Sequence, residues 1–304
     1  MPWQCTIRRA ASTSGVGIHC GQHARLTLRP APPCTGIVFV RTDLGEAIPA
    51  RAENAHDLAM ATSLARHGAQ AGTVEHVLAA LAGLGVTNAF VDLDGPEVPI
   101  LDGSALPFVQ MIQRVGLEEQ RVSLAEIRLK TLIRVADADR SIELRPAARL
   151  TVDYRISFAS PAVGEQRFAG PLTPERFATA IAPARTFGFL DEVEALRARG
   201  LGKGATLDNC VVVDGGKVVS GQLRFADEFV RHKVLDLLGD LALLEYPLRA
   251  EVVATKAGHA LHVVAIQKLL ETPEAWELVE PDRVAPFTVQ PFRTEWDADA
   301  AAAV

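Results

Sequence analysis

The chain has 304 residues, of which 48% are hydrophobic and 22% charged, and its net charge at pH 7 is −6. This length suits one large domain or two of ordinary size, with enough apolar side chains for a full core. The acidic balance argues against a dedicated nucleic-acid binder, which usually presents a basic surface, so we expect no nucleic-acid partner.

The first part of the chain, up to residue 115, is expected to form strands and helices separated by turns. Strands are expected where apolar and polar residues alternate or where a short apolar run occurs. Thr73 suits the start of a helix, and glycines mark the end of that helix. The expected elements are strands at 24–29 and 36–41, a helix from 73 to 83, a strand at 88–94 and a helix at 104–115.

Polar and charged residues at 116–123 predict a domain boundary. Beyond it we expect strands at 126–135, 141–145 and 150–158, helices at 174–181 and 225–243, a strand at 249–255 and a last helix after residue 258. Strands and helices do not alternate strictly, which favours an α+β fold over a doubly wound sheet. The predicted division is an N-terminal α+β domain at 1–120, a C-terminal α+β domain at 126–285 and a low-complexity tail at 286–304.

Cysteine usage and hydropathy bear on the compartment. The four cysteines, Cys5, Cys20, Cys34 and Cys210, form no C-x-x-C pair and predict a reduced, cytoplasmic chain. The longest apolar run, at 77–86, contains two glycines and is too short for a membrane span, so no transmembrane segment is expected.

The most informative segment is the predicted helix at 225–243. His232, Asp236 and Asp240 follow one another at intervals of four residues, which places all three on one helix face. The imidazole and the first carboxylate suit a metal ion, and the second carboxylate suits an outer-shell partner. These three residues form a stripe that borders the apolar face of the helix, so we expect their side chains to be half buried. The same spacing also occurs on ordinary solvated helix faces.

Glu75 and His76, at the start of the helix from 73, form a second candidate group. Together with His232 and Asp236, His76 completes two imidazoles and one carboxylate, the ligand set of a catalytic zinc site with an open position. Glu75 then suits a general base for water. A Glu-His dipeptide alone is a weak signal, and the zinc-protease pattern H-E-x-x-H is absent.

His259 follows Gly258 directly after a predicted strand. A protonated imidazole at this turn suits an acid that protonates a leaving amine or stabilises an oxyanion. The alternative is a histidine satisfied at a strand–helix corner, and the nearby His262 competes for the assignment. No P-loop, dinucleotide fingerprint or G-x-S-x-G serine motif is present, and we interpret the glycine cluster at 15–21 as a turn.

Several segments together resemble the zinc-dependent UDP-3-O-acyl-N-acetylglucosamine deacetylases of lipid A synthesis. The matching stretches run in order from about residue 6 to about residue 270, and their combination is far more specific than any one of them. They are Gly15-Val-Gly-Ile-His-Cys-Gly21, 26–32, Thr73-Val-Glu-His76, 80–85, 96–105, Ala184-Arg-Thr-Phe-Gly-Phe189, 224–240 and Lys256-Ala-Gly-His-Ala-Leu261.

The resemblance implies a role for each matched position. It implies zinc (Zn2+) ligands at His76, His232 and Asp236, while the sequence does not distinguish zinc from ferrous iron as the metal used in the cell. The implied catalytic groups are Glu75 as general base, His259 as acid and cationic partner of the tetrahedral intermediate, Asp240 as the group that orients His259, and Thr186 at the oxyanion.

The implied substrate is a UDP-linked acylated amino sugar. Lys233 and Lys256 would meet its diphosphate with His19 nearby, and Phe158 would stack on the uracil. Phe187 and Gly188 would line the sugar and acyl site. The implied fold is two similar α+β domains packed face to face as a layered sandwich, and an inserted βαβ element within about 189–219 would enclose the acyl chain. We expect a monomer.

The chain departs from the family pattern at Ala159 and Ser160, where polar residues that often include a histidine are usual, and at His262, where an asparagine is common. These positions bear on the nucleotide and the acid rather than on the metal centre. Two alternatives remain: a sugar-nucleotide binding module that has lost turnover, and a different zinc hydrolase acting on a related acylated amide.

Overall fold

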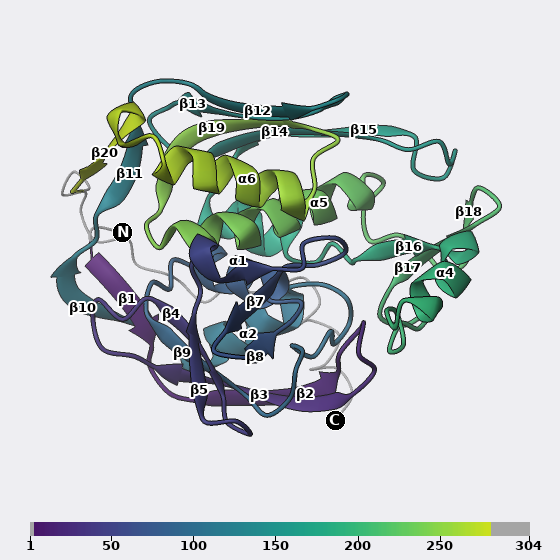
Figure 1. The fold of residues 1–304 in the computed structure, drawn as a ribbon, viewed down its shortest axis with the longest axis horizontal. Helices are drawn as coiled ribbons and strands as arrows, with labels where there is room; N and C mark the ends of the chain where they lie inside the picture. The colour runs from purple at the N-terminus through teal and green to yellow at the C-terminus, as the bar shows by residue number, and fades with distance from the viewer. Residues whose placement is uncertain (1–2, 281–304) are drawn as a thin grey trace, which may run out of the picture.

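The computed structural model describes residues 3–280 of the chain. Two large β-sheets form outer layers, and helices lie between them (Figure 1). Sheets and helices do not alternate regularly along the chain, and this confirms the predicted α+β class.

The helices and strands fall into two groups, before and after residue 124. The elements before residue 124 are β1 Trp3–Ile7, β2 Ala11–Val16, β3 His23–Pro30, β4 Ile37–Arg41, β5 Glu46–Pro49, β6 Ala55–His56, β7 Ser63–Arg66, β8 Ala69–Ala71, α1 Glu75–Gly83, β9 Ala89–Leu93, α2 Leu106–Val115 and β10 Leu117–Ser123. The later elements are β11 Glu126–Leu129, β12 Ile133–Asp137, β13 Arg140–Pro146, β14 Thr151–Ser157, β15 Glu165–Pro171, α3 Pro174–Arg176, β16 Phe187–Phe189, α4 Val193–Ala198, β17 Val211–Asp214, β18 Lys217–Val218, α5 Glu228–Leu241, β19 Leu248–Thr255, α6 His259–Leu270 and β20 Trp276–Val279.

The first large sheet has five strands in the order β2-β3-β9-β4-β5, with β9 parallel to β4 and antiparallel to β3. Its strands bury alternate residues, as a sheet with one face on the core requires. On β3 the buried residues are Ala24, Leu26 and Leu28, which belong to the core shared with the helices. A small sheet consists of β6, β7 and β8, and Thr62, directly before β7, bonds to Val74 and Glu75 at the start of α1.

The second sheet has seven strands, with β19 at its centre. One edge of β19 pairs antiparallel with β13, and its other edge pairs parallel with β11 at its start and with β14 along the rest. Leu248, Ala250, Val252 and Ala254 are buried in strict alternation on β19. The helix α5 packs on β14 and β15, and α6 packs on β12 and β13, so both helices lie against this sheet.

Close packing of α1 on α5 joins the helices into one layer (Figure 1). The contact depends on Gly239, because a β-carbon at this position would overlap the Glu75 carbonyl oxygen. A glycine within a helix costs up to about 1 kcal/mol relative to alanine. Here it lets the first turn of α1, which carries Glu75 and His76, lie directly against the helix that carries His232 and Asp236.

A small αβ unit projects at the side of the molecule (Figure 1). Its strands β16 and β17 are parallel and are joined through α4, and β18 adds an antiparallel third strand. The structure therefore contains a βαβ element at the place where the resemblance implied one.

Some expected elements differ from the observed ones. The expected strand at 126–135 is two strands, β11 and β12, and the polar stretch at 116–123 is the strand β10, paired with β1, rather than an irregular boundary. The glycine cluster at 15–21 begins inside β2. These strands are short or largely exposed, so they lack the apolar alternation that reveals strands in a sequence.

The helix predicted at 174–181 is present as α3 followed by a π-helical turn, Phe177–Ile181. Among residues 3–280 no helix combines the length and the apolar character that crossing a bilayer requires. The predicted tail at 286–304 lies outside the described residues, and the division of the chain into two domains at 120–126 stays a prediction.

Candidate active site

The first turn of α1 carries Glu75 and His76, and both residues are only 3% exposed. Thr73, just before the helix, has a positive φ of 54° and donates its hydroxyl proton to Glu97 Oε1 at 2.7 Å. This side-chain bond fixes the turn that begins α1, a helix of the layer between the two sheets (Figure 1).

His232, Asp236 and Asp240 lie on one face of α5, as their spacing predicts. They are nearly or fully buried, at 3%, 2% and 0% exposure, rather than half buried as expected. The reason is that α1 and α6 both pack on α5 and cover this face. Because buried charge is costly without a partner, the surroundings of each group decide what the face can do.

The structure brings His76, His232 and Asp236 together from α1 and α5. Asp236 Oδ1 lies 3.3 Å from His232 Nε2 and 3.9 Å from His76 Nε2. The two imidazole rings meet edge to face, with centroids 5.1 Å apart. One donor atom from each residue therefore lies within 4.8 Å of the others, close enough for all three to share a cation.

Two of the three atoms that would bind a metal ion, His232 Nε2 and Asp236 Oδ1, carry no proton. His232 Nδ1 donates to the Ala184 carbonyl at 3.1 Å, which leaves an unprotonated Nε2 facing Asp236 Oδ1. Among the described residues Asp236 Oδ1 has no hydrogen-bond partner, although it is buried. Two acceptors 3.3 Å apart repel each other, and a metal ion between them removes that repulsion.

The protonation states of the trio also suit a metal ligand set. Burial, reinforced by the neighbouring His232, lowers the pKa of His76 to about 3, so the ring is neutral. Burial also lowers the pKa of His232. For Asp236, burial alone would raise the pKa, but His232, Lys233 and His259 outweigh burial and hold the pKa below its usual range. Two neutral imidazoles and one carboxylate result, the forms that bind divalent metals.

Glu75 lies at the edge of the trio, and one of its oxygens is within 4.8 Å of Asp236 and His259 donor atoms. Its Oε2 accepts a hydrogen bond from the Thr62 backbone N–H at 3.0 Å. Burial raises the pKa of Glu75 to about 8. Since a nearby cation favours the charged carboxylate, metal binding would bring this pKa down toward the range of a general base.

His259, the first residue of α6, binds Asp240 through Nδ1–H, which donates to Oδ2 at 2.8 Å. Its Nε2 lies 3.8 Å from Asp236 Oδ2, so this nitrogen faces the trio. Burial alone would lower the pKa of His259, but the charge and the hydrogen bond of Asp240 outweigh burial and raise the pKa to about 9. The ring is therefore a cation at neutral pH.

The unusual His262 belongs to the same network. Its Nδ1–H donates to Asp240 Oδ2 at 2.8 Å, and its Nε2 lies 2.9 Å from the Tyr154 hydroxyl. Burial lowers the pKa of His262, so this ring stays neutral while His259 carries the charge. His262 is fully buried and its Nδ1 proton is committed to Asp240, which leaves His259 as the histidine that faces the trio.

The loop after β2 carries His19, which is close enough to His259 for the two rings to interact electrostatically. Glu97 holds this loop by accepting the backbone N–H groups of His19 at 2.9 Å and of Cys20 at 2.7 Å. The ring of His19 is partly buried, and its Nδ1 has no hydrogen-bond partner among residues 3–280. Burial lowers the pKa of His19.

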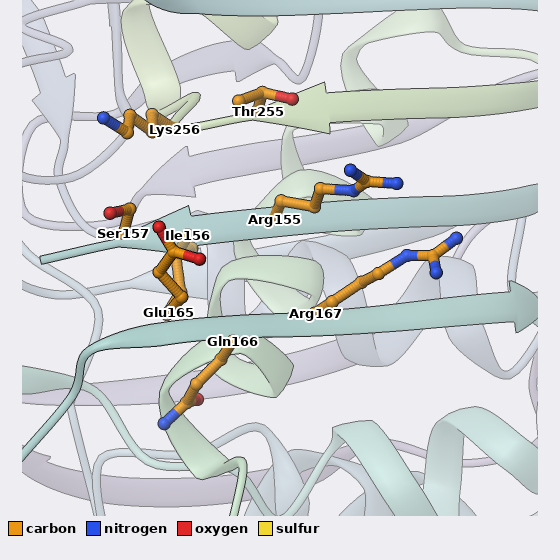
Figure 2. A pocket seen from close by; sticks show the side chains of 8 residues that line it. All are labelled: Arg155, Ile156, Ser157, Glu165, Gln166, Arg167, Thr255 and Lys256. Atoms are coloured by element: carbon orange, nitrogen blue, oxygen red, sulfur yellow. The ribbon is translucent and has the colours of Figure 1, made fainter.

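The two lysines expected at the diphosphate occupy different surroundings. Lys233 Nζ lies 2.5 Å from Asp236 Oδ2, beside the trio. Lys256 Nζ lies 2.7 Å from Asp139 Oδ2 and is partly exposed. Lys256 lines a pocket of about 500 Å³ on the ends of β14, β15 and β19, where the cross-strand neighbours Arg155 and Arg167 extend in the same direction (Figure 2).

Aromatic rings cluster where the first strand of the βαβ unit, β16, meets the trio. The ring of Phe187 lies 6.2 Å from that of His232 and 5.6 Å from that of Phe158, centroid to centroid. Gly188 follows in β16. Thr186 is fixed by its backbone, whose N–H donates to the Gly103 carbonyl at 2.7 Å and whose carbonyl accepts from Val211 N–H at 2.8 Å. Phe187 therefore borders the trio beside His232, and Phe158 packs against Phe187.

Sequence reasoning missed two residues that hold the site together. Thr62 bonds Glu75, Asp240 and His259, and no motif marks it. Glu228 accepts from the backbone N–H of Arg185 at 3.0 Å and from its guanidinium Nε at 2.9 Å. This ion pair holds the segment that presents the Ala184 carbonyl to His232. Helical spacing could have placed Glu228 one turn before His232, but not its partner.

Comparison with known proteins gives one consistent result. The sequence model of the UDP-3-O-acyl N-acetylglycosamine deacetylase family (LpxC) matches residues 4–271. A protein of Myxococcus xanthus named UDP-3-O-acyl-N-acetylglucosamine deacetylase is 45% identical, over 92% of this chain and 90% of its own length. Proteins of the same name from Shewanella violacea and Anaeromyxobacter sp. are each 44% identical, over 95% and 91% of this chain and 97% and 91% of their own lengths. With matches of this extent, the chain belongs to the UDP-3-O-acyl-N-acetylglucosamine deacetylase family.

Proposed function

We propose that the protein removes the N-acetyl group from UDP-3-O-acyl-N-acetylglucosamine, giving UDP-3-O-acyl-glucosamine and acetate, as a step of lipid A biosynthesis. The names of its relatives supply the substrate. The observation that carries the proposal is one buried cluster in which the trio His76, His232 and Asp236 adjoins Glu75 and His259. Amide hydrolysis needs a Lewis acid, a base for water and an acid for the amine, and this cluster offers a group for each.

His76, His232 and Asp236 would hold zinc, with His232 oriented by the Ala184 carbonyl. Two histidines and a carboxylate form a common catalytic zinc set. A bound zinc ion would act as a Lewis acid that polarises the acetamide carbonyl. The Lys233 ammonium on Asp236 Oδ2 leaves Oδ1 as the oxygen that faces the two imidazoles.

The remaining groups move protons and stabilise charge. Glu75 takes a proton from the attacking water, whose oxygen forms a bond to the acetyl carbon. His259 stabilises the tetrahedral intermediate with its positive charge and then gives its proton to the amine nitrogen as the C–N bond breaks. Asp240 orients His259 through the bond to Nδ1. Thr186 supports the oxyanion. The products are acetate and the free amine.

Six further residues would contact the rest of the substrate. His19, Lys233 and Lys256 would meet the diphosphate, Phe158 the uracil, and Phe187 with Gly188 the sugar and the acyl chain, which the βαβ unit encloses. We further propose two α+β domains, a monomeric protein and a location in the cytoplasm. Lys233 and Lys256 are paired with Asp236 and Asp139, so each lysine would leave its carboxylate when it binds the diphosphate.

Acetate release from UDP-3-O-acyl-N-acetylglucosamine tests the proposal directly. We expect turnover by the purified protein, loss of at least about 90% of it after a chelator removes the metal, and recovery on adding back about one equivalent of zinc. A protein that binds this substrate with metal in place but releases no acetate would instead be a binding module. Release that continues unchanged after complete metal removal would refute the metal-dependent mechanism.

A further inference from the structure

Thr62 lies directly before β7 and is fully buried where the small sheet meets α1, α5 and α6. Its backbone N–H donates to Glu75 Oε2 at 3.0 Å, and its carbonyl accepts from Val74 N–H at 3.0 Å. Its hydroxyl lies 2.6 Å from Asp240 Oδ1 and 3.1 Å from His259 Nδ1. One residue thus touches both the base and the acid of the proposed reaction.

The protons around Asp240 fix the direction of these bonds. Asp240 Oδ2 accepts the Nδ1 protons of His259 and His262, both at 2.8 Å. The Thr62 hydroxyl has a single proton, and the short distance to the carboxylate shows that it donates to Oδ1. Its oxygen can then accept a share of the His259 Nδ1 proton. Among residues 3–280, Thr62 is the one hydrogen-bond donor to Asp240 Oδ1.

We propose that Thr62 is a positioning residue that holds Glu75 and the His259–Asp240 pair in a fixed relation, an inference that rests on the proposed deacetylase function. Glu75 starts α1, Asp240 ends the stripe on α5 and His259 starts α6, so three elements share this threonine. The base and the acid act on the same amide, and a misplacement of about 1 Å can cost about 10²-fold in rate. The hydroxyl also prevents Asp240 Oδ1 from becoming a buried, unpaired acceptor.

A matched pair of variants tests this role. Thr62→Val keeps the shape and both backbone bonds but removes the hydroxyl, whereas Thr62→Ser keeps the hydroxyl. We expect Thr62→Val to lower kcat by about 10- to 100-fold, with KM within about threefold and metal content unchanged, because among the described residues the Thr62 hydroxyl bonds only Asp240 and His259. Thr62→Ser should stay within about threefold of the unmodified enzyme in kcat.

Wild-type kcat in Thr62→Val, or equal impairment of both variants, would overturn the positioning role. If valine prevents folding, Thr62→Ala compared with Thr62→Ser isolates the hydroxyl in the same way, since the two differ by one oxygen. Metal content and the thermal midpoint, measured on each variant, separate positioning from general damage. An unmodified enzyme that releases no acetate would count against the proposed function, whereas an active one with an active valine variant counts against Thr62 alone.

Discussion

Replacing Glu75 with glutamine is expected to lower kcat for acetate release by about 10²- to 10⁴-fold, the usual contribution of a general base. The amide is nearly the same size and can still accept the Thr62 N–H bond, so α1 keeps its place. Glutamine cannot take a proton from water, and Glu75 is not one of the three proposed metal ligands. Metal content, measured by elemental analysis beside kcat, should therefore stay at the unmodified level.

A matched control is Glu119→Gln, which removes an exposed carboxylate on β10 and should leave kcat within about twofold of the unmodified enzyme. Acetate release by Glu75→Gln at the unmodified rate would show that another group activates the water. Loss of the metal in this variant would show instead that Glu75 belongs to the ligand set.

Replacing His232 with alanine is expected to weaken metal binding by more than about 100-fold. Losing a group that only orients a metal ligand can cost about 10- to 100-fold in affinity, and this change removes a proposed ligand itself. The variant also leaves the Asp236 carboxylate, buried to 2% exposure, with fewer compensating contacts. Elemental analysis after dialysis against metal-free buffer should find little metal in the variant and about one equivalent in the unmodified protein.

His23→Ala is the matched control, since His23 is an exposed histidine at the start of β3. It should retain the metal and the activity. Full metal retention by His232→Ala would remove His232 from the ligand set and leave the stripe on α5 as a structural feature.

Sequence spacing predicted the part of the site that lies on one helix. The four-residue intervals of His232, Asp236 and Asp240 require one face once the helix forms, and α5 bears this out. The depth of burial was underestimated because it depends on α1 and α6, which cover that face through contacts far apart in the chain. Periodicity carries no information on which helices will meet. The joining of His76 to the stripe therefore rested on the resemblance and on chemical plausibility.

Long-range hydrogen bonds account for most of what the sequence did not reveal. Thr62 reaches Asp240 across 178 positions, and nothing in its neighbourhood distinguishes it from an ordinary loop threonine. The position of Lys233 on Asp236 follows from helical spacing of three residues, yet a lysine on a helix face more often points to solvent. His262 stands where an asparagine is common in the family. Its Nδ1–H donates a hydrogen bond to Asp240 Oδ2, which also accepts the bond from His259.

Anomalous X-ray scattering at the zinc edge, measured on crystals of the zinc-loaded protein, would locate the metal ion independently of activity. We predict one strong peak bounded by His76 Nε2, His232 Nε2 and Asp236 Oδ1, at about 2.0–2.2 Å from each. A peak held by other residues, or zinc-loaded active protein without a peak at this trio, would contradict this prediction.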